Sequence, residues 1–127
     1  MEKLIKAVFT DVIENKNYDE SLINKYFSED YIQSVDNVTL DFNSFKKHIQ
    51  KLKEKADQQN VVFENIASNE TSVFTKHFVT SVLKNGEIVK HKVFAEFTIK
   101  NNKVIYCDEL TTLLEGSASE KKLGSEI

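Results

Sequence analysis

Apolar side chains in the first part of the chain recur every three or four positions, which is the spacing of one face of an α-helix. The pattern predicts three amphipathic helices, over about residues 2–15, 18–27 and 41–57. Asn17 and Glu20 have the spacing of a capping box for the second helix, and Asp41 is a candidate N-cap for the third. We expect a short extended stretch at 31–34, between these two helices.

From Val61 the period of the apolar positions changes to two, which is typical of β-strands. The alternation predicts four strands, over about residues 61–68, 72–83, 88–99 and 103–114. Asn85-Gly86 and Asn101-Asn102 lie between the last three strands, and both pairs accept the positive φ angles of a two-residue type I′ turn. We therefore expect two tight hairpins in succession.

Two-residue loops would fix the register of these strands, and with it which side chains share a face. They would pair Leu83 with Ile88, and Ile99 with Val104. The face expected beneath the helices then holds Phe74, Lys76, Phe78, Thr80, Val82, Val89, His91, Val93, Ala95, Phe97, Ile99, Val104, Tyr106, Asp108, Leu110, Thr112 and Leu114. The opposite, mixed face holds Thr75, His77, Val79, Ser81, Lys90, Lys92, Phe94, Glu96, Thr98, Cys107, Glu109 and Thr111. A single β-bulge would exchange the two faces beyond it.

This order of elements predicts an α+β fold, in which three N-terminal helices pack on one face of a strongly curved antiparallel sheet. At 127 residues the chain is long enough for a single domain with a real core, which we place at 1–115. Residues 116–127 are small and polar, then charged, and we expect them to form a polar C-terminal tail.

The composition argues against several classes of partner. The formal net charge of −3, without a basic stripe that carries interleaved aromatic residues, speaks against a nucleic-acid binder. No apolar run approaches the ~20 residues of a membrane span, and Met1–Lys3 lead into an amphipathic pattern rather than a signal-peptide core. The one cysteine, Cys107, allows no intrachain disulfide. We therefore expect a cytoplasmic protein without a membrane partner.

Asp108 is the sharpest candidate for chemistry. The expected register places it on the apolar face, opposite Ala95. A carboxyl group in an apolar cavity has a raised pKa and can act as a general acid or base. The alternative is a structural carboxylate at the rim of the cavity, paired with Lys76 or His91.

Other polar side chains could contribute to the same site. His91 lies on the same expected face and is either catalytic or a hydrogen-bonded core histidine. Tyr31 could act with Asp108 or only pack, and Gln33 and His48 could line the mouth of a cavity. The further residues expected to contact a ligand are Lys76, Phe78, Phe97, Tyr106 and Thr112.

No cofactor or metal is expected. The histidines lack any close ligand spacing, and with three glycines the chain has no phosphate-binding glycine loop. His77, Glu96 and Glu109 share the mixed face, where a salt-linked surface or a dimer contact fits better than a metal site.

The stretches 103–111, 113–116 and 123–125 are similar to the ending of small bacterial SnoaL-like proteins, which belong to the nuclear transport factor 2-like (cystatin-like cone) superfamily. Tyr31-x-Gln33-x-x-Asp36 and Phe45-x-x-His48 also resemble family positions. The resemblance covers essentially the whole chain. It implies a sheet wrapped around a cone-shaped pocket that the helices close, and a homodimer. It does not imply one activity, because relatives include cyclases, isomerases, epoxide hydrolases and binding modules.

The chain departs from the better-defined enzymes of this superfamily. The positions that match the base of the polyketide cyclases look like Thr112 and Asp108, so that base is displaced or absent. The chain has no arginine for the Asp-Arg-Asp set of the epoxide hydrolases. The tyrosine and paired acids of the isomerases are met only loosely, by Tyr31 and Asp108.

Two kinds of function follow. The first is a cofactor-free enzyme of the isomerase, cyclase or hydrolase type that acts on a hydrophobic carbonyl compound. Asp108 would take a proton beside the carbonyl group, and His91, Tyr31 or Gln33 would hold the enolate oxygen. The second is a non-catalytic module that binds a small hydrophobic molecule or only a second copy of itself. The homodimer would form through the mixed face, with Val79, Phe94 and Thr111 in the contact.

Overall fold

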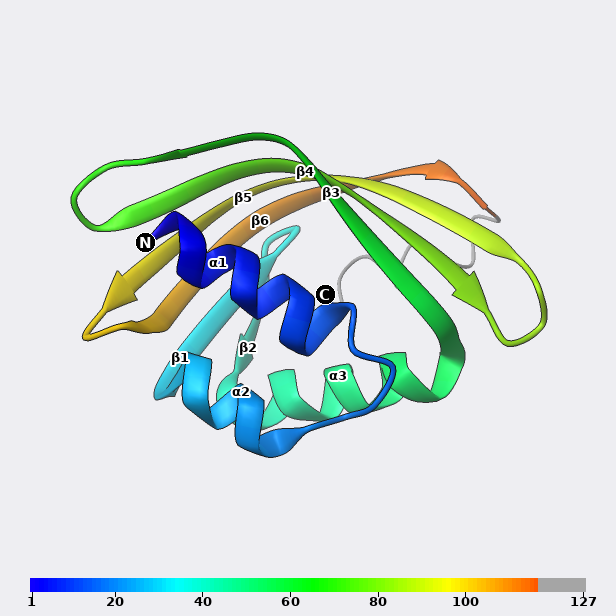
Figure 1. The fold of residues 1–127 in the computed structure, drawn as a ribbon, viewed down its shortest axis with the longest axis horizontal. Coiled ribbons are helices and arrows are strands. Elements are labelled where there is room, and N and C mark those ends of the chain that lie inside the picture. The colour runs from blue at the N-terminus through cyan, green and yellow to red at the C-terminus, as the bar shows by residue number, and fades with distance from the viewer. Residues whose placement is uncertain (117–127) are drawn as a thin grey trace.

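The computed structural model describes residues 1–116 and has helices on one side of a six-stranded sheet (Figure 1). The helices are α1 (Glu2–Val8), the π-helix η1 (Phe9–Ile13) that continues it, α2 (Glu20–Tyr26) and α3 (Phe42–Lys55). The strands are β1 (Phe27–Val35), β2 (Val38–Asp41), β3 (Ala56–Ser68), β4 (Ser72–Leu83), β5 (Ile88–Lys100) and β6 (Lys103–Glu115). The predicted polar tail, apart from Gly116, lies outside the described residues.

The sheet has the strand order β2-β1-β6-β5-β4-β3, and the predicted α+β class is confirmed. The prediction of a purely antiparallel sheet is wrong, because β1 pairs with β6 in parallel. The sheet arches over α1 and α3 in Figure 1. It is not strongly curled, whereas the sequence had predicted a strongly curved sheet. The stretch predicted at 31–34 is the middle of the nine-residue β1, which joins the sheet beside the C-terminal strand.

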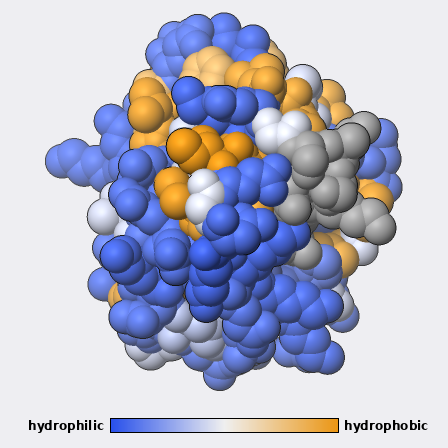
Figure 2. All heavy atoms as spheres, turned by 90° about the vertical axis from the view of Figure 1, so that its right-hand side faces the viewer, coloured by the Kyte–Doolittle hydropathy of each residue, from blue (hydrophilic) through white to orange (hydrophobic). Residues whose placement is uncertain are grey.

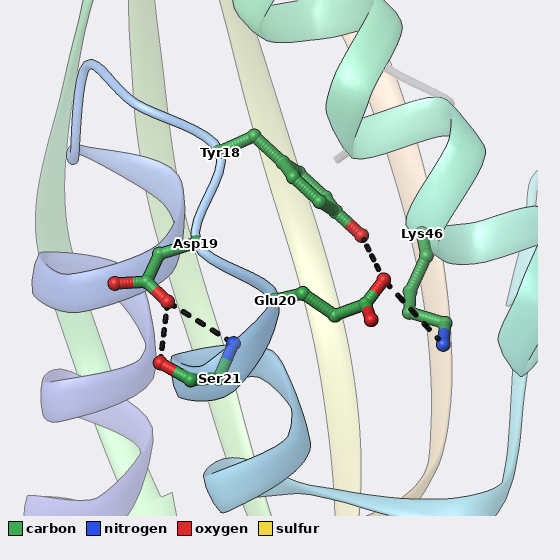
Figure 3. A network of polar contacts seen from close by, with 5 residues as sticks. All are labelled: Tyr18, Asp19, Glu20, Ser21 and Lys46. Atoms are coloured by element: carbon green, nitrogen blue, oxygen red, sulfur yellow. Dashed lines mark hydrogen bonds and ion pairs between the residues drawn. The ribbon is translucent and has the colours of Figure 1, made fainter.

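The predicted N-cap is confirmed for α3, but the N-cap of α2 is a different residue from the one predicted. Asp41 caps α3 as predicted, since its Oδ1 accepts a hydrogen bond of 2.8 Å from the Ser44 amide. Asp19, rather than Asn17, caps α2 by accepting from the Ser21 amide at 3.0 Å. Glu20 instead accepts from the Tyr18 hydroxyl and pairs with Lys46, which ties the start of α2 to α3 (Figure 3).

The first hairpin loop differs from the prediction. Among its residues only Gly86 has a positive φ, of 89°. The Leu83 amide donates to the Glu87 carbonyl at 2.8 Å, so the loop has three residues and the form of a type I turn followed by a glycine bulge. Val82 therefore pairs with Ile88, one position away from the expected register. This single step turns the odd-numbered side chains of β4 toward the helices.

The second hairpin has the predicted turn and an additional bulge. Asn101 and Asn102 have φ angles of 52° and 64°, which confirms the two-residue loop. Ile99 pairs with Val104, but the next pair is Thr98 with Tyr106, so β6 carries one extra residue. Beyond this bulge, the side chains of β6 that were expected on the inner face lie on the outer face, and the reverse holds for the others.

The predicted faces are therefore right for β5 and wrong for β4 and for most of β6. Val93 and Phe97 are buried beneath the helices as predicted. Phe74 and Leu110 are exposed on the outer face, whereas His77 and Glu109 are buried on the inner one. The core between this inner face and the helices is rich in aromatic residues, and Phe9 of η1 lies at its centre, with its ring against those of Phe63, His77 and Phe97.

Candidate functional site

A group of buried polar side chains lies on the inner face of β1 and β6. Parallel pairing places Gln33 beside Cys107 and Val35 beside Glu109. Tyr31, two residues before Gln33 on β1, is buried on the same side. We refer to Tyr31, Gln33, Cys107 and Glu109 as the inner polar cluster.

Tyr31 is held as a hydrogen-bond donor. Its hydroxyl donates to Oε1 of Gln33 at 2.9 Å. Its ring packs against Phe27 and Phe45, with centroids 4.7 and 4.9 Å away. Burial, followed by electrostatic interactions with Cys107 and Glu109, raises the pKa of Tyr31 well above its usual value. The phenol therefore stays protonated, and within the described chain Nε2 of Gln33 is left as an unused buried donor.

Glu109 is a buried carboxyl group. Its side chain is 4% exposed, and its buried Oε1 has no hydrogen-bond partner among the described residues. Burial raises its pKa well above the usual range, and the nearby charges of Asp36 and Asp108 add to the effect. A carboxyl group in this environment holds its proton at a pH where an exposed glutamate is ionised.

Asp36 fixes the turn between β1 and β2 against this part of β6. Its amide donates to the Glu109 carbonyl at 2.9 Å. Its carboxylate accepts from the amide and the hydroxyl of Thr111, at 2.8 and 2.6 Å. Asp36 therefore fixes the backbone of β6 at Glu109 and at Thr111, where β1 ends.

His77 and Thr75 form a second buried polar pair, on β4. Nδ1 of the imidazole and the Thr75 hydroxyl are 2.9 Å apart. Burial lowers the pKa of His77 to about 4, so the ring is neutral at neutral pH. Thr75 and Glu109 flank Ala95 in one row of the sheet, which separates their backbones by two strand spacings, or about 10 Å.

The structure divides the predicted site residues between the two faces. Tyr31, Gln33, His91 and Phe97 are buried on the inner side. His48 is half-buried on α3. The outer face of the sheet holds Asp108, Lys76, Phe78, Tyr106 and Thr112.

The predicted burial of Asp108 is wrong, because the bulge in β6 turns it outward. It lines a shallow outer hollow of about 390 Å³, together with residues that include Asn37, Phe74, Phe94, Glu96 and Leu110. Sequence reasoning missed Glu109 as the inner carboxyl group. The consecutive acids Asp108 and Glu109 were the available signal, because a one-residue shift in register exchanges one for the other.

Within residues 1–116, no three histidine, cysteine, aspartate or glutamate side chains gather closely enough to hold a metal ion. No helix in this part of the chain has the length and apolar character needed to cross a membrane.

No family model matches the sequence. The chain is 28% identical to the uncharacterized protein C11D3.04c of Schizosaccharomyces pombe over 125 residues, which cover 98% of this chain and 92% of the relative.

Solved structures identify the fold. A protein from Jannaschia sp. CCS1, assigned as a SnoaL-like polyketide cyclase, matches with a TM-score of 0.72 and 15% identity over 86% of this chain and 83% of its own. An NTF2-like protein of unknown function from Exiguobacterium sp. 255-15 matches with a TM-score of 0.71 and 12% identity over 86% of this chain and 98% of its own. The chain therefore has the NTF2-like fold of SnoaL-like proteins. Because fold does not fix activity, the function has to be argued from the site.

Proposed function

We propose that the inner polar cluster binds the carbonyl group of a small hydrophobic compound and that Glu109 moves a proton beside that group, in a reaction without a cofactor. The observation that carries this proposal is a buried carboxyl group, with its pKa raised, on the same inner face as a protonated tyrosine. Such a carboxylate is a stronger base than an exposed glutamate, because burial raises its pKa.

Three residues of the cluster, Tyr31, Gln33 and Glu109, take part in this reaction. Ionised Glu109 takes a proton from the carbon next to the carbonyl group, and the electron pair of the broken C–H bond moves to the carbonyl oxygen. Nε2 of Gln33 donates a hydrogen bond to the enolate oxygen that forms, and the Tyr31 hydroxyl fixes the Gln33 amide by donating to its Oε1. Glu109 then returns the proton to carbon. Glu109 takes the part that the sequence suggested for Asp108.

A second candidate is a binding protein without catalysis, and the same raised pKa supports it. A protonated Glu109 is a hydrogen-bond donor, as is Nε2 of Gln33. The two would hold a ligand carbonyl oxygen in the aromatic core without any bond changing. SnoaL-like and NTF2-like neighbours do not decide between the two candidates, because their likeness is one of fold.

One experiment separates the candidates. The probe is β-tetralone, an aromatic ketone with acidic α-hydrogens, and exchange of these hydrogens in D2O is followed by proton NMR while binding is followed by amide shifts of the protein. An enzyme should accelerate exchange, lose the acceleration in Glu109→Gln and keep it in the matched outer-face control Asp108→Asn. Saturable binding without exchange would support the binding protein. The absence of both would overturn the proposal.

We also propose a homodimer, formed through the outer face of the sheet. The contact predicted from the sequence has to be revised, because Val79 and Thr111 lie on the inner side, and of the three residues named only Phe94 remains. Phe94, at 52% exposed, and Leu110, at 59%, pair across β5 and β6 in the middle of the outer face.

The charges around this apolar row suit a second copy of the same face. On one side of the row, Glu96 pairs with Asp108. On the other side, Lys92 of β5 lies two residues from Phe94. A two-fold axis along the row would place the carboxylates of one copy opposite Lys92 of the other, which is the self-complementarity that a symmetric contact requires. Sedimentation at micromolar concentration should give twice the chain mass, and a monomer mass throughout would contradict the dimer.

A further inference from the structure

A basic hollow lies at the end of the molecule where α3 ends, away from the inner polar cluster. The C-terminal end of α3, the start of β3 and the β4–β5 hairpin meet at the right of Figure 1. Figure 2 views this end directly and shows a largely hydrophilic face with apolar atoms near its centre. The hollow has a volume of about 530 Å³ and is lined by Lys16, Lys53, Ala56, Asp57, Gln58, Val82 and Lys84.

The lining is positive although the chain as a whole is acidic. Lys16, Lys53 and Lys84 face a single acidic residue, Asp57, whereas the whole chain carries a formal net charge of −3. The nearby carboxylate of Glu14 is engaged elsewhere, because it accepts a hydrogen bond of 2.9 Å from the Val61 amide. With its lysines protonated, the hollow therefore has two positive charges in excess, and Ala56 and Val82 add apolar wall.

Lys53 differs from the two exposed lysines because it is half-buried. Its Nζ donates to the carbonyl oxygen of Ile13 at 2.6 Å. An ammonium group has two further hydrogens, and no described carboxylate forms an ion pair with them. Burial lowers the pKa of Lys53 to about 8, without an opposing charge effect from Asp57. The charge of Lys53 is thus partly desolvated, and no carboxylate of residues 1–116 neutralises it.

We propose that this hollow binds a small organic dianion of the phosphate-monoester class, with Lys53 at its base and Lys16 and Lys84 at its rim. The dianion supplies the countercharge that Lys53 lacks and matches the charge excess of the lining. The organic part of the ligand contacts Ala56 and Val82. The site does not depend on the proposed function of the inner polar cluster.

The test uses phenyl phosphate as the probe and amide NMR shifts of the full chain as the readout. Shifts should saturate and should centre on residues that line the hollow, including Asp57 and Lys84. Lys53→Met should weaken binding at least tenfold, while Lys51→Met, an exposed position two residues earlier on α3, should leave it unchanged. Lys84→Ser, in the exposed hairpin loop, should weaken binding several-fold and tests the site if Lys53→Met does not fold.

Protonation gives an independent check. The affinity should fall as the pH rises through about 8, because Lys53 loses its charge there while the exposed lysines keep theirs. Benzyl alcohol, which lacks the phosphate, should not bind. Shifts that rise linearly without saturation, or equal losses in Lys53→Met and Lys51→Met, would overturn the proposal.

Discussion

Asp108 and Glu109 are neighbours in the sequence and lie on opposite sides of β6. Glu109 is 4% exposed and faces the helices, whereas Asp108 is exposed and lines a hollow on the outer face. The two carboxyl groups are therefore adjacent in the sequence, but one is buried and the other is in contact with solvent. This makes Asp108→Asn the matched control for Glu109→Gln, since it changes a carboxyl group on the same strand that is exposed rather than buried.

Glu109→Gln should stabilise the fold at high pH. The folded-state pKa of Glu109 is raised above its unfolded value, so the folded state binds the proton more tightly and loses stability as the pH rises from the unfolded toward the folded pKa. Each unit by which the folded-state pKa exceeds the unfolded-state pKa lowers the free energy of unfolding at high pH by about 1.4 kcal/mol. Urea unfolding should show Glu109→Gln to be more stable than the wild type at pH 8, with the difference shrinking toward pH 4. Asp108→Asn should show a much smaller trend of the same sign, because it removes only one of the charges that raise the pKa of Glu109 and leaves its burial unchanged.

His77 should affect stability in the opposite direction. Its folded-state pKa of about 4 lies below the ordinary value of 6.5, so the unfolded state takes up the proton first. Its contribution to stability is complete above pH 6.5 and is lost as the pH falls toward 4. The imidazole C–H signals of His77 should therefore stay constant between pH 5.5 and 8 in an NMR titration. A midpoint near 6.5 would show that the ring is in water.

Gly86 gives a test of the first hairpin loop. Its φ of 89° favours glycine, and a Cβ built there would meet no atom within 4 Å. Gly86→Ala should therefore destabilise the fold by about 1 kcal/mol through backbone strain alone. Asn102→Gly, at a φ of 64° in the other turn, should be close to neutral. Thermal unfolding of the two variants measures both effects, and an unchanged stability of Gly86→Ala would contradict the three-residue loop.

Charge exchange tests the proposed homodimer. Lys92→Glu should weaken the dimer because it places like charges opposite each other across the two-fold axis. The double variant Lys92→Glu with Glu96→Lys restores the opposite pairing and should recover the dimer. Sedimentation of the wild type and both variants at several salt concentrations is the measurement. Equal masses for all three proteins would show that these charges lie outside any contact.

Most of the fold was predictable from the sequence, because it depends on patterns that many residues share. The helical spacing, the strand alternation and the N-cap at Asp41 each have a local physical cause. The positions of the faces were not predictable, because they depend on two single-residue events. The sequence around Asn85-Gly86 is compatible with a loop of two residues and with a loop of three. The bulge near Ile105 has no distinct signal in the sequence. Tyr31 and Gln33 were expected to alternate on one extended segment, and both lie buried on the same side of β1.

The central claim is that the inner carboxyl group is Glu109 and that burial raises its pKa above that of the exposed glutamates. The most direct measurement is a carbon-13 NMR titration of the glutamate side-chain carboxyl groups, with Glu109 assigned by the signal that disappears in Glu109→Gln. We predict that this signal titrates well above the range of the exposed glutamates. A midpoint within their range, near the ordinary value of ~4.3, would contradict both the buried carboxyl group and the proton transfer built on it.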